Sequence, residues 1–228
     1  TFVDREHDRV LEHSLTYAVV ESENVDAAKM ALEIGGPRAQ RAGLYALEGI
    51  GEKALTIDLL KPHLSSKESI VRDAAWAMAE RHAEWGGQIA TLFEKQLREI
   101  KDDETGLNFP RAADRELAAR AAKMASSEAI QEVLLRIAND KSLSLRARRT
   151  ALEAMAEARL PQLPDAWLAL ASDLIKNTEM HFEPVRLLGS HKPGKHQAKQ
   201  VRELILSVGE DETVEPLTRL QALSRLGT

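Results

Sequence analysis

Arginine is the polar residue that recurs most often along the Ala- and Leu-rich segments of this chain. Its guanidinium group is planar and donates paired hydrogen bonds, so it suits the recognition of carboxylates. Arginines in such positions have two alternative roles: ion pairs with acidic side chains of adjacent segments, or contacts with an acidic peptide or a neighbouring domain. The six candidates are Arg38, Arg41, Arg72, Arg120, Arg148 and Arg149.

Two aromatic residues add to these candidates. Trp85 precedes a pair of glycines where two helical patterns meet, so we expect its ring to be partly exposed. Phe109 lies in the long polar segment 101–111, which is either disordered or functional. Trp76 and Trp167, in contrast, fall on apolar stripes and are expected in the core. Trp85 and Phe109 therefore join the six arginines as possible partner-binding residues.

The chain contains no complete motif for catalysis, metal binding or cofactor binding. Residues 189–196 match the start of a phosphate-binding loop, but His196 stands where Ser or Thr must hold magnesium. His7 and His13 are six residues apart, which places them on opposite sides of a helix. The absence of Cys excludes thiolate metal sites and cysteine nucleophiles. We therefore expect a non-catalytic protein without cofactor or metal, and the sequence identifies no small-molecule ligand.

The segments that carry the arginines belong to a repeated pattern. Residues 41–47 and 149–155 share Arg, two small residues, Leu, any residue, Ala, and then Leu or Met. They lie 108 residues apart, which is three times 36. Weaker copies occur at 71–79, 118–124 and 220–226. A period of this size predicts a stack of similar helical units.

A second amphipathic segment precedes each copy, with apolar residues at intervals of three and four. Examples are residues 54–60, 89–97, 130–137 and 167–175. Such helix pairs bury their apolar stripes only against neighbouring pairs, which predicts an all-α protein: an α-solenoid of about six helix pairs plus an N-terminal helix, without strands. We treat residues 1–228 as one such domain. The residues predicted to be buried between layers are Leu44, Leu47, Ala75, Ala121, Leu152 and Met155.

The pattern of Leu64, Val71-Arg72 and Ala75 resembles the HEAT-repeat family. The resemblance implies that the first helix of each pair lines the convex side and the second the concave side. Residues 8–18 are also similar to the start of the HEAT region in large multidomain proteins of planctomycetes and verrucomicrobia. Those proteins carry a c-type haem domain and a dehydrogenase-like propeller, which implies a cell-envelope or periplasmic location. Neither the haem motif nor a propeller pattern occurs in this chain.

Charge and hydropathy restrict the classes of partner. The formal net charge is −5 and the pI is about 5.9, which argues against nucleic acid as a partner. Residues 106–205 alone carry a net charge of +4, which is compatible with helix faces of mixed charge. No apolar stretch approaches the roughly 18 residues that span a bilayer. The first residue is not Met, and the repeat pattern runs to the last residues, so we expect a piece of a longer protein.

Three functions compete at this level. The first is a protein-interaction or scaffold module that contacts another protein or neighbouring domains of its own chain. The second is an enzyme on a HEAT-like scaffold, such as a DNA glycosylase, which would recruit Trp76, Trp85 and the Arg148-Arg149 pair. Its basic groove conflicts with the acidic balance of this chain. The third, a pigment-attaching lyase of HEAT type, has no residue signature here.

Overall fold

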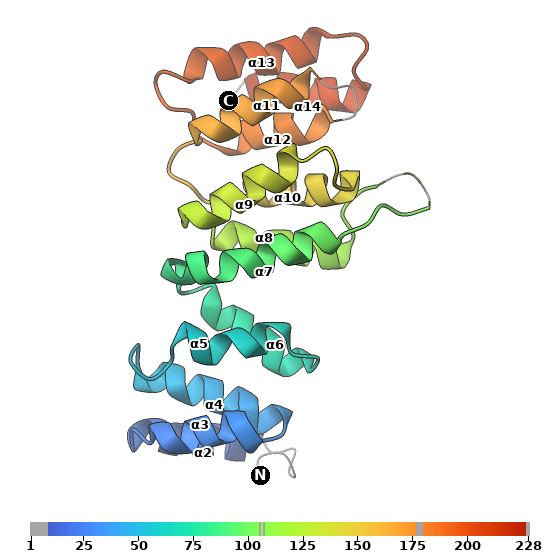
Figure 1. Ribbon diagram of the computed structural model, residues 1–228. Helices are drawn as coiled ribbons and strands as arrows, with labels where there is room; N and C mark the ends of the chain where they lie inside the picture. Colours follow the sequence, from blue (N-terminus) through green and yellow to red (C-terminus); the bar gives the residue numbers. More distant parts are fainter. Residues whose placement is uncertain (1–8, 105, 107, 177–179, 227–228) are drawn as a thin grey trace. The chain divides into compact units, whose positions relative to one another are not determined.

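The computed structural model describes residues 9–104, 106, 108–176 and 180–226, and this part of the chain is helical without any strand (Figure 1). It contains thirteen α-helices, the number expected for six pairs and one extra N-terminal helix. Their bounds are α2 Arg9–Glu21, α3 Val25–Ile34, α4 Pro37–Ile50, α5 Ile57–Leu60, α6 Ser69–Ala79, α7 Gly86–Glu99, α8 Ala112–Lys123, α9 Glu128–Asn139, α10 Leu145–Glu157, α11 Asp165–Ile175, α12 Phe182–Ser190, α13 Ala198–Glu210 and α14 Pro216–Leu226. Two 3₁₀ turns, η1 Lys61–Ser65 and η2 Ala83–Trp85, complete the set.

The Ala- and Leu-rich copies of the repeat all lie on helices, and their apolar positions form the core. Each of the six residues predicted to be buried has no measurable exposure: Leu44, Leu47, Ala75, Ala121, Leu152 and Met155. Trp76 and Trp167 are also buried, as predicted, each with 1% of its surface exposed. The Trp76 indole donates a hydrogen bond of 3.0 Å to the carbonyl of Leu64, so its polar atom is satisfied inside the core.

One predicted helix differs from its expected extent. The amphipathic pattern of residues 54–60 predicts a helix, but α5 covers only its last four residues and continues as the 3₁₀ turn η1. Pro62 lies in that turn and has no amide hydrogen to donate to the preceding helical turn. Because the α-helical hydrogen-bond ladder is interrupted there, α5 ends at Leu60 and the segment continues as η1. The late start at Ile57 has another cause, since the backbone of Thr56 is extended (φ −117°, ψ 158°).

The chain divides into two compact units, residues 1–85 and residues 86–228, which we call unit 1 and unit 2. Within unit 1, α4 packs against α2, α3 and α6, and η1 packs against α6. Gly43 permits the close approach of α4 to α3, since a Cβ at this position would lie 2.7 Å from the carbonyl oxygen of Ala28. Asn24 accepts a hydrogen bond from the amide of Ala27 and so caps the start of α3.

Unit 2 is built mainly from contacts between alternate helices. Helix α7 packs against α9, α8 against α10, α10 against α12, and α12 against α14. Consecutive helices also pair, as α9 does with α10, α11 with α12, and α13 with α14. A pattern in which each helix contacts both its sequence neighbour and its next-but-one neighbour buries both sides of the inner helices. Accordingly, α10 has eight buried residues among its thirteen.

Candidate functional site

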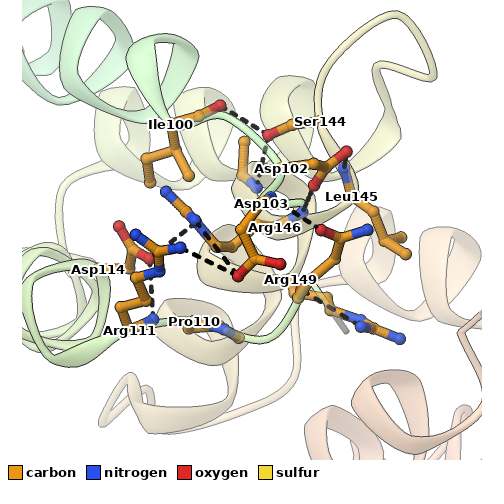
Figure 2. Close-up of polar contacts among 12 residues, drawn as sticks. Ile100, Asp102, Asp103, Pro110, Arg111, Asp114, Ser144, Leu145, Arg146 and Arg149 are labelled. Carbon is orange, nitrogen blue, oxygen red and sulfur yellow. Dashed lines mark hydrogen bonds and ion pairs between the residues drawn. The ribbon is translucent and has the colours of Figure 1, made fainter. Parts of the chain in front are cut away.

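The long segment between α7 and α8 packs against the start of α10 in unit 2 (Figure 2). Both carboxylate oxygens of Asp102 accept hydrogen bonds from helix amides, one from Leu145 at 3.1 Å and one from Arg146 at 2.9 Å. Ser144, the N-cap of α10, donates a 2.6 Å hydrogen bond to the carbonyl of Ile100. The first helical amides need such acceptors, and a carboxylate there is stabilised by the helix dipole.

A partly buried network of ion pairs fixes the other end of the same segment. The Arg146 Nε lies 3.1 Å from Asp114 Oδ2, and each of these side chains is 11% exposed. Asp114 also accepts a 2.8 Å hydrogen bond from the amide of Arg111, while the Arg111 guanidinium lies 3.1 Å from Asp103. The described residues of segment 101–111 are therefore held by Asp114 of α8, through the amide of Arg111, and by Arg146 of α10, whose Nη1 lies 4.0 Å from Asp103 (Figure 2). Thr105 and Leu107 lie outside the described residues.

Phe109 and Arg149, both predicted as candidates, are in contact. The Arg149 guanidinium carbon lies 4.5 Å from the centre of the Phe109 ring, a cation–π arrangement, and Nη1 donates a 3.2 Å hydrogen bond to the carbonyl of Asn108. Phe109 is 55% exposed although it is held in place. An aromatic ring that is both fixed and exposed is a suitable contact surface, because its binding costs little side-chain entropy.

Glu183, at the start of α12, completes the charge arrangement around Arg149. Its Oε1 lies 2.8 Å from Arg149 Nε, and the two side chains are 10% and 12% exposed. Burial raises the pKa of Glu183 above its ordinary value of 4.5, while the positive charge of Arg149 opposes that rise. The second carboxylate oxygen, Oε2, is buried and has no hydrogen-bond partner in the described protein. Such an acceptor leaves an uncompensated desolvation cost.

These residues line a cleft with two lobes in unit 2. The smaller lobe has a volume of about 260 Å³ and the larger about 630 Å³. Four residues line both lobes, namely Phe109, Arg149, Phe182 and Glu183. Phe182 is 43% exposed, so two aromatic rings are accessible above a buried ion pair. We call this the Phe109 cleft.

The six candidate arginines do not converge on one site. Arg38, Arg41 and Arg72 belong to unit 1, whereas Arg120, Arg148 and Arg149 belong to unit 2. Four of the six have an acidic partner in the same chain: Arg41 with Glu12, Arg72 with Asp73, Arg120 with Glu116, and Arg149 with Glu183.

The remaining two arginines are at least partly buried. Arg38 is partly buried on α4. Arg148 is only 5% exposed and donates a 3.1 Å hydrogen bond to the carbonyl of Ala138. Because Arg148 is buried, another protein cannot contact its side chain, and we leave it out of the candidate surface.

Trp85 is partly exposed, as predicted, and belongs to unit 1, whereas the Phe109 cleft belongs to unit 2. Its ring stacks on His82, with centroids 4.0 Å apart and planes 15° from parallel. The His82 ring nitrogen Nδ1 lies 2.7 Å from a Glu84 oxygen. This stacking holds Trp85 in a defined orientation on the surface of its own unit.

Sequence reasoning missed Phe182 and Glu183, and it missed a second cleft in unit 1. That cleft, of about 480 Å³, is lined by Tyr17, Tyr45 and Arg41 among others, and both tyrosines are exposed. Aromatic residues make up only 4% of the chain, so each one that lies outside an apolar stripe stands out. That position was the signal in the sequence that could have identified these residues.

Residues 189–196, which resemble a phosphate-binding loop, form the end of α12 and the turn that leads to α13. In that turn Gln197 accepts a 2.7 Å hydrogen bond from the amide of Gly194 and donates to the carbonyl of Leu163. The element before the turn is a helix and not the strand that a phosphate-binding loop requires. His7 lies outside the described residues, so its relation to His13 is not defined.

Comparison with protein-family models, curated proteins and solved structures yields no match to this chain. Within the described residues, no cluster of three or more His, Asp or Glu side chains has a metal-binding arrangement. The described helices are also too short or too polar to cross a bilayer. The fold and the site therefore define an all-helical protein with an aromatic-rimmed cleft in unit 2.

Proposed function

We propose that this chain is a HEAT-like α-solenoid that acts as a non-catalytic scaffold or protein-interaction module. It binds its partner through the Phe109 cleft. The observation that carries the proposal is the pair of exposed aromatic side chains, Phe109 and Phe182, that line both lobes above a fixed polar network. Aromatic residues are enriched among the side chains that dominate protein–protein binding energies. The rigid support from Asp102, Arg146 and Arg149 lowers the entropic cost of such binding.

The contacts between alternate helices in unit 2 support the solenoid part of the proposal. In a stack of helix pairs, first helices pack on first helices and second helices on second helices. The contacts of α7 with α9 and of α8 with α10 agree with that arrangement. The repeat of the Arg, small, small, Leu pattern at residues 41–47 and 149–155 supports the same conclusion.

Exposed apolar side chains on α3 and α14 support an interaction role. On α14, Leu217 is 71% exposed and Leu220 65%. On α3, Met30 is 58% exposed and Ile34 75%. Terminal repeats that face only water need a polar outer surface. These helices therefore offer apolar faces to neighbouring domains or to a partner.

A peptide selection tests the proposed function. A phage-displayed library of random peptides is panned on the wild-type chain and counter-selected on a variant with Phe109→Ser and Phe182→Ser. The two side chains are 55% and 43% exposed and lie outside the core, so the variant should retain its helical circular dichroism and its unfolding midpoint. We expect enriched peptides that bind the wild type and lose about tenfold or more in affinity for the variant. Peptides that bind both proteins equally would remove the Phe109 cleft from the proposal.

The nucleic-acid alternative is separated by a second measurement. Binding to a fluorescent DNA duplex is followed while the salt concentration is raised. The acidic net charge of −5 leads us to expect no specific binding near physiological salt. A binding constant whose logarithm falls steeply and linearly with the logarithm of salt concentration would favour a DNA-binding function in place of the interaction module.

A further inference from the structure

The turn between α13 and α14 gives one side of the Phe109 cleft an acidic character. Residues 210–215 contain four acidic side chains and no basic one. Asp211 is used within the turn, where it accepts hydrogen bonds from the amide and the hydroxyl of Thr213. Glu212 and Glu215 are exposed, and Glu215 lines the larger lobe. This side of the cleft therefore presents negative charge that the turn itself does not neutralise.

The arginine that lines the larger lobe is already engaged. Arg149 lines the larger lobe, but it is paired with Glu183 and stacked on Phe109. The charge of Arg149 is thereby paired with Glu183, and Glu215 is the carboxylate of the lobe that no arginine pairs with among the ion pairs of the described residues. An acidic peptide is the partner that the arginine pattern suggested. Glu215 would repel it, and Arg149, the arginine of this lobe, is already paired with Glu183.

Glu183 is a second acidic side chain in the wall of the cleft. Its side chain is nine-tenths buried, lines both lobes, and has one oxygen without a hydrogen-bond partner. This oxygen is itself buried, so it adds to the negative character of the lobe wall without being a contact point for a ligand. The raised pKa of Glu183, caused mainly by burial, agrees with a carboxylate that Arg149 alone does not fully compensate.

Apolar side chains complete the larger lobe. Leu217 lines it and is 71% exposed, next to the accessible rings of Phe182 and Phe109. A ligand that matches this surface must carry an apolar side chain beside a positive one. Burial of an apolar side chain against such rings would stabilise the complex by removing apolar surface from water.

We infer that the larger lobe of the Phe109 cleft binds a basic amphipathic segment of a partner protein, with an apolar side chain against Phe182 and Leu217 and a Lys or Arg facing Glu215. This inference rests on the proposed interaction function and names the chemistry of its partner. The lysine or arginine supplies a positive charge that complements Glu215.

Two designed probes test the inference on the full chain by fluorescence anisotropy. The first is a fluorescein-labelled amphipathic helix of about 14 residues made of Lys and Leu, and the second replaces each Lys with Glu. We expect the basic probe to bind about tenfold or more tightly than the acidic one. Equal or tighter binding of the acidic probe would overturn the inference.

Matched variants separate a local site from bulk charge attraction. Glu215→Lys should weaken the basic probe by about tenfold, and Glu215→Gln, which keeps an acceptor for the Thr218 hydroxyl, by about threefold. Glu203→Lys and Glu203→Gln make the same charge changes on the exposed surface of α13, outside the cleft, and should alter the affinity less than about twofold. Equal losses from the Glu203 and Glu215 variants would overturn the inference.

The peptide selection distinguishes this inference from the proposed function. Peptides that require Phe109 and Phe182 but are enriched in Asp and Glu would overturn the basic-partner inference and leave the interaction function standing. Enrichment of Lys and Arg beside Leu or Phe would support both. Failure to enrich any peptide dependent on the two rings would overturn both at once.

Discussion

Glu183 is a carboxylate whose burial should be visible in the pH dependence of stability. Burial raises its pKa in the folded protein above the ordinary value of 4.5. Below pH 4.5 the group is protonated in both states, and its contribution to stability is fully present. As the pH rises through the raised pKa, the unfolded state loses its proton first, so this contribution is lost.

Glu183→Gln removes this titration and keeps the shape of the side chain. We therefore expect the wild type to lose stability relative to the variant as the pH is raised from 4.5, in urea unfolding followed at several pH values. Glu203→Gln, on the exposed surface of α13, is the matched control and should leave the pH profile of the wild type unchanged. A constant difference between wild type and Glu183→Gln at all pH values would contradict the assignment.

Leu152 tests the core at the level of a single side chain. It lies on α10 with no measurable exposure, and truncation to Ala leaves a cavity between helices. We expect Leu152→Ala to lower the free energy of unfolding by about 2 to 5 kcal/mol in chemical denaturation. Leu220→Ala removes the same atoms from a side chain that is 65% exposed and should change it by less than about 0.5 kcal/mol. A loss below about 1 kcal/mol at Leu152 would contradict its place in the core.

At the scale of elements, the helices and their buried positions were predictable from local sequence. Apolar residues at intervals of three and four mark which face of each helix is covered, and this depends only on the helical period. The pattern of residues 149–155, for example, places Leu152 and Met155 in the core, where both are found. The shortened α5 was the exception, because the extended backbone of Thr56 makes the helix begin only at Ile57.

The candidate site was predictable only in part. Phe109 and Arg149 could be proposed from residue type and position, but their contact depends on how segment 101–111 folds back on α10. That return is fixed by Asp102 binding amides 43 and 44 residues further along the chain, a pairing without a local sequence signal. Phe182 and Glu183 enter the site through the packing of α10 with α12, which periodicity does not specify in detail.

Two adjacent glycines at the start of α7 should respond in opposite ways to the same substitution. A Cβ on Gly86 would overlap the Cβ and Oγ of Ser127, at the start of α9, whereas a Cβ on Gly87 would meet nothing within 4 Å. We expect Gly86→Ala to destabilise by about 1 to 3 kcal/mol through overpacking. Gly87→Ala should stabilise by about 0.5 to 1 kcal/mol because it removes backbone freedom from the unfolded chain.

Urea unfolding of the two variants measures this difference, and each glycine is the control for the other. Because the two positions are adjacent on one helix, helix propensity alone would stabilise both variants. Stabilisation by both substitutions would show that α7 and α9 do not approach each other at Gly86 as described. Destabilisation by both would show instead that Gly87 has contacts of its own.

At the scale of the whole molecule, stability is distributed between two compact units, each with its own core. In unit 2 the buried residues include Phe93 on α7 and Trp167 on α11, with 0% and 1% exposure. The helices α7 to α14 pack on one another within the unit. In repeat proteins, stability is approximately a sum of individual repeats and the interfaces between neighbours. A piece that keeps its internal interfaces should therefore keep its fold.

We expect a fragment of residues 86–228 to fold. Trp76 and Trp85 fall outside the fragment, so Trp167 becomes its single tryptophan and reports directly on the core. The fragment should show helical circular dichroism, a blue-shifted tryptophan emission and one cooperative transition in urea.

A fragment of residues 112–228 is the matched control. It lacks α7, and with it the buried side chains of Phe93 and Leu97, together with the Asp102 carboxylate that binds the first amides of α10. The loss of that packing and of the cap should lower its urea midpoint well below that of the longer fragment. If the longer fragment instead shows solvent-exposed tryptophan emission and no cooperative transition, unit 2 does not carry its own stability, and the division into two units describes only the geometry of the folded chain.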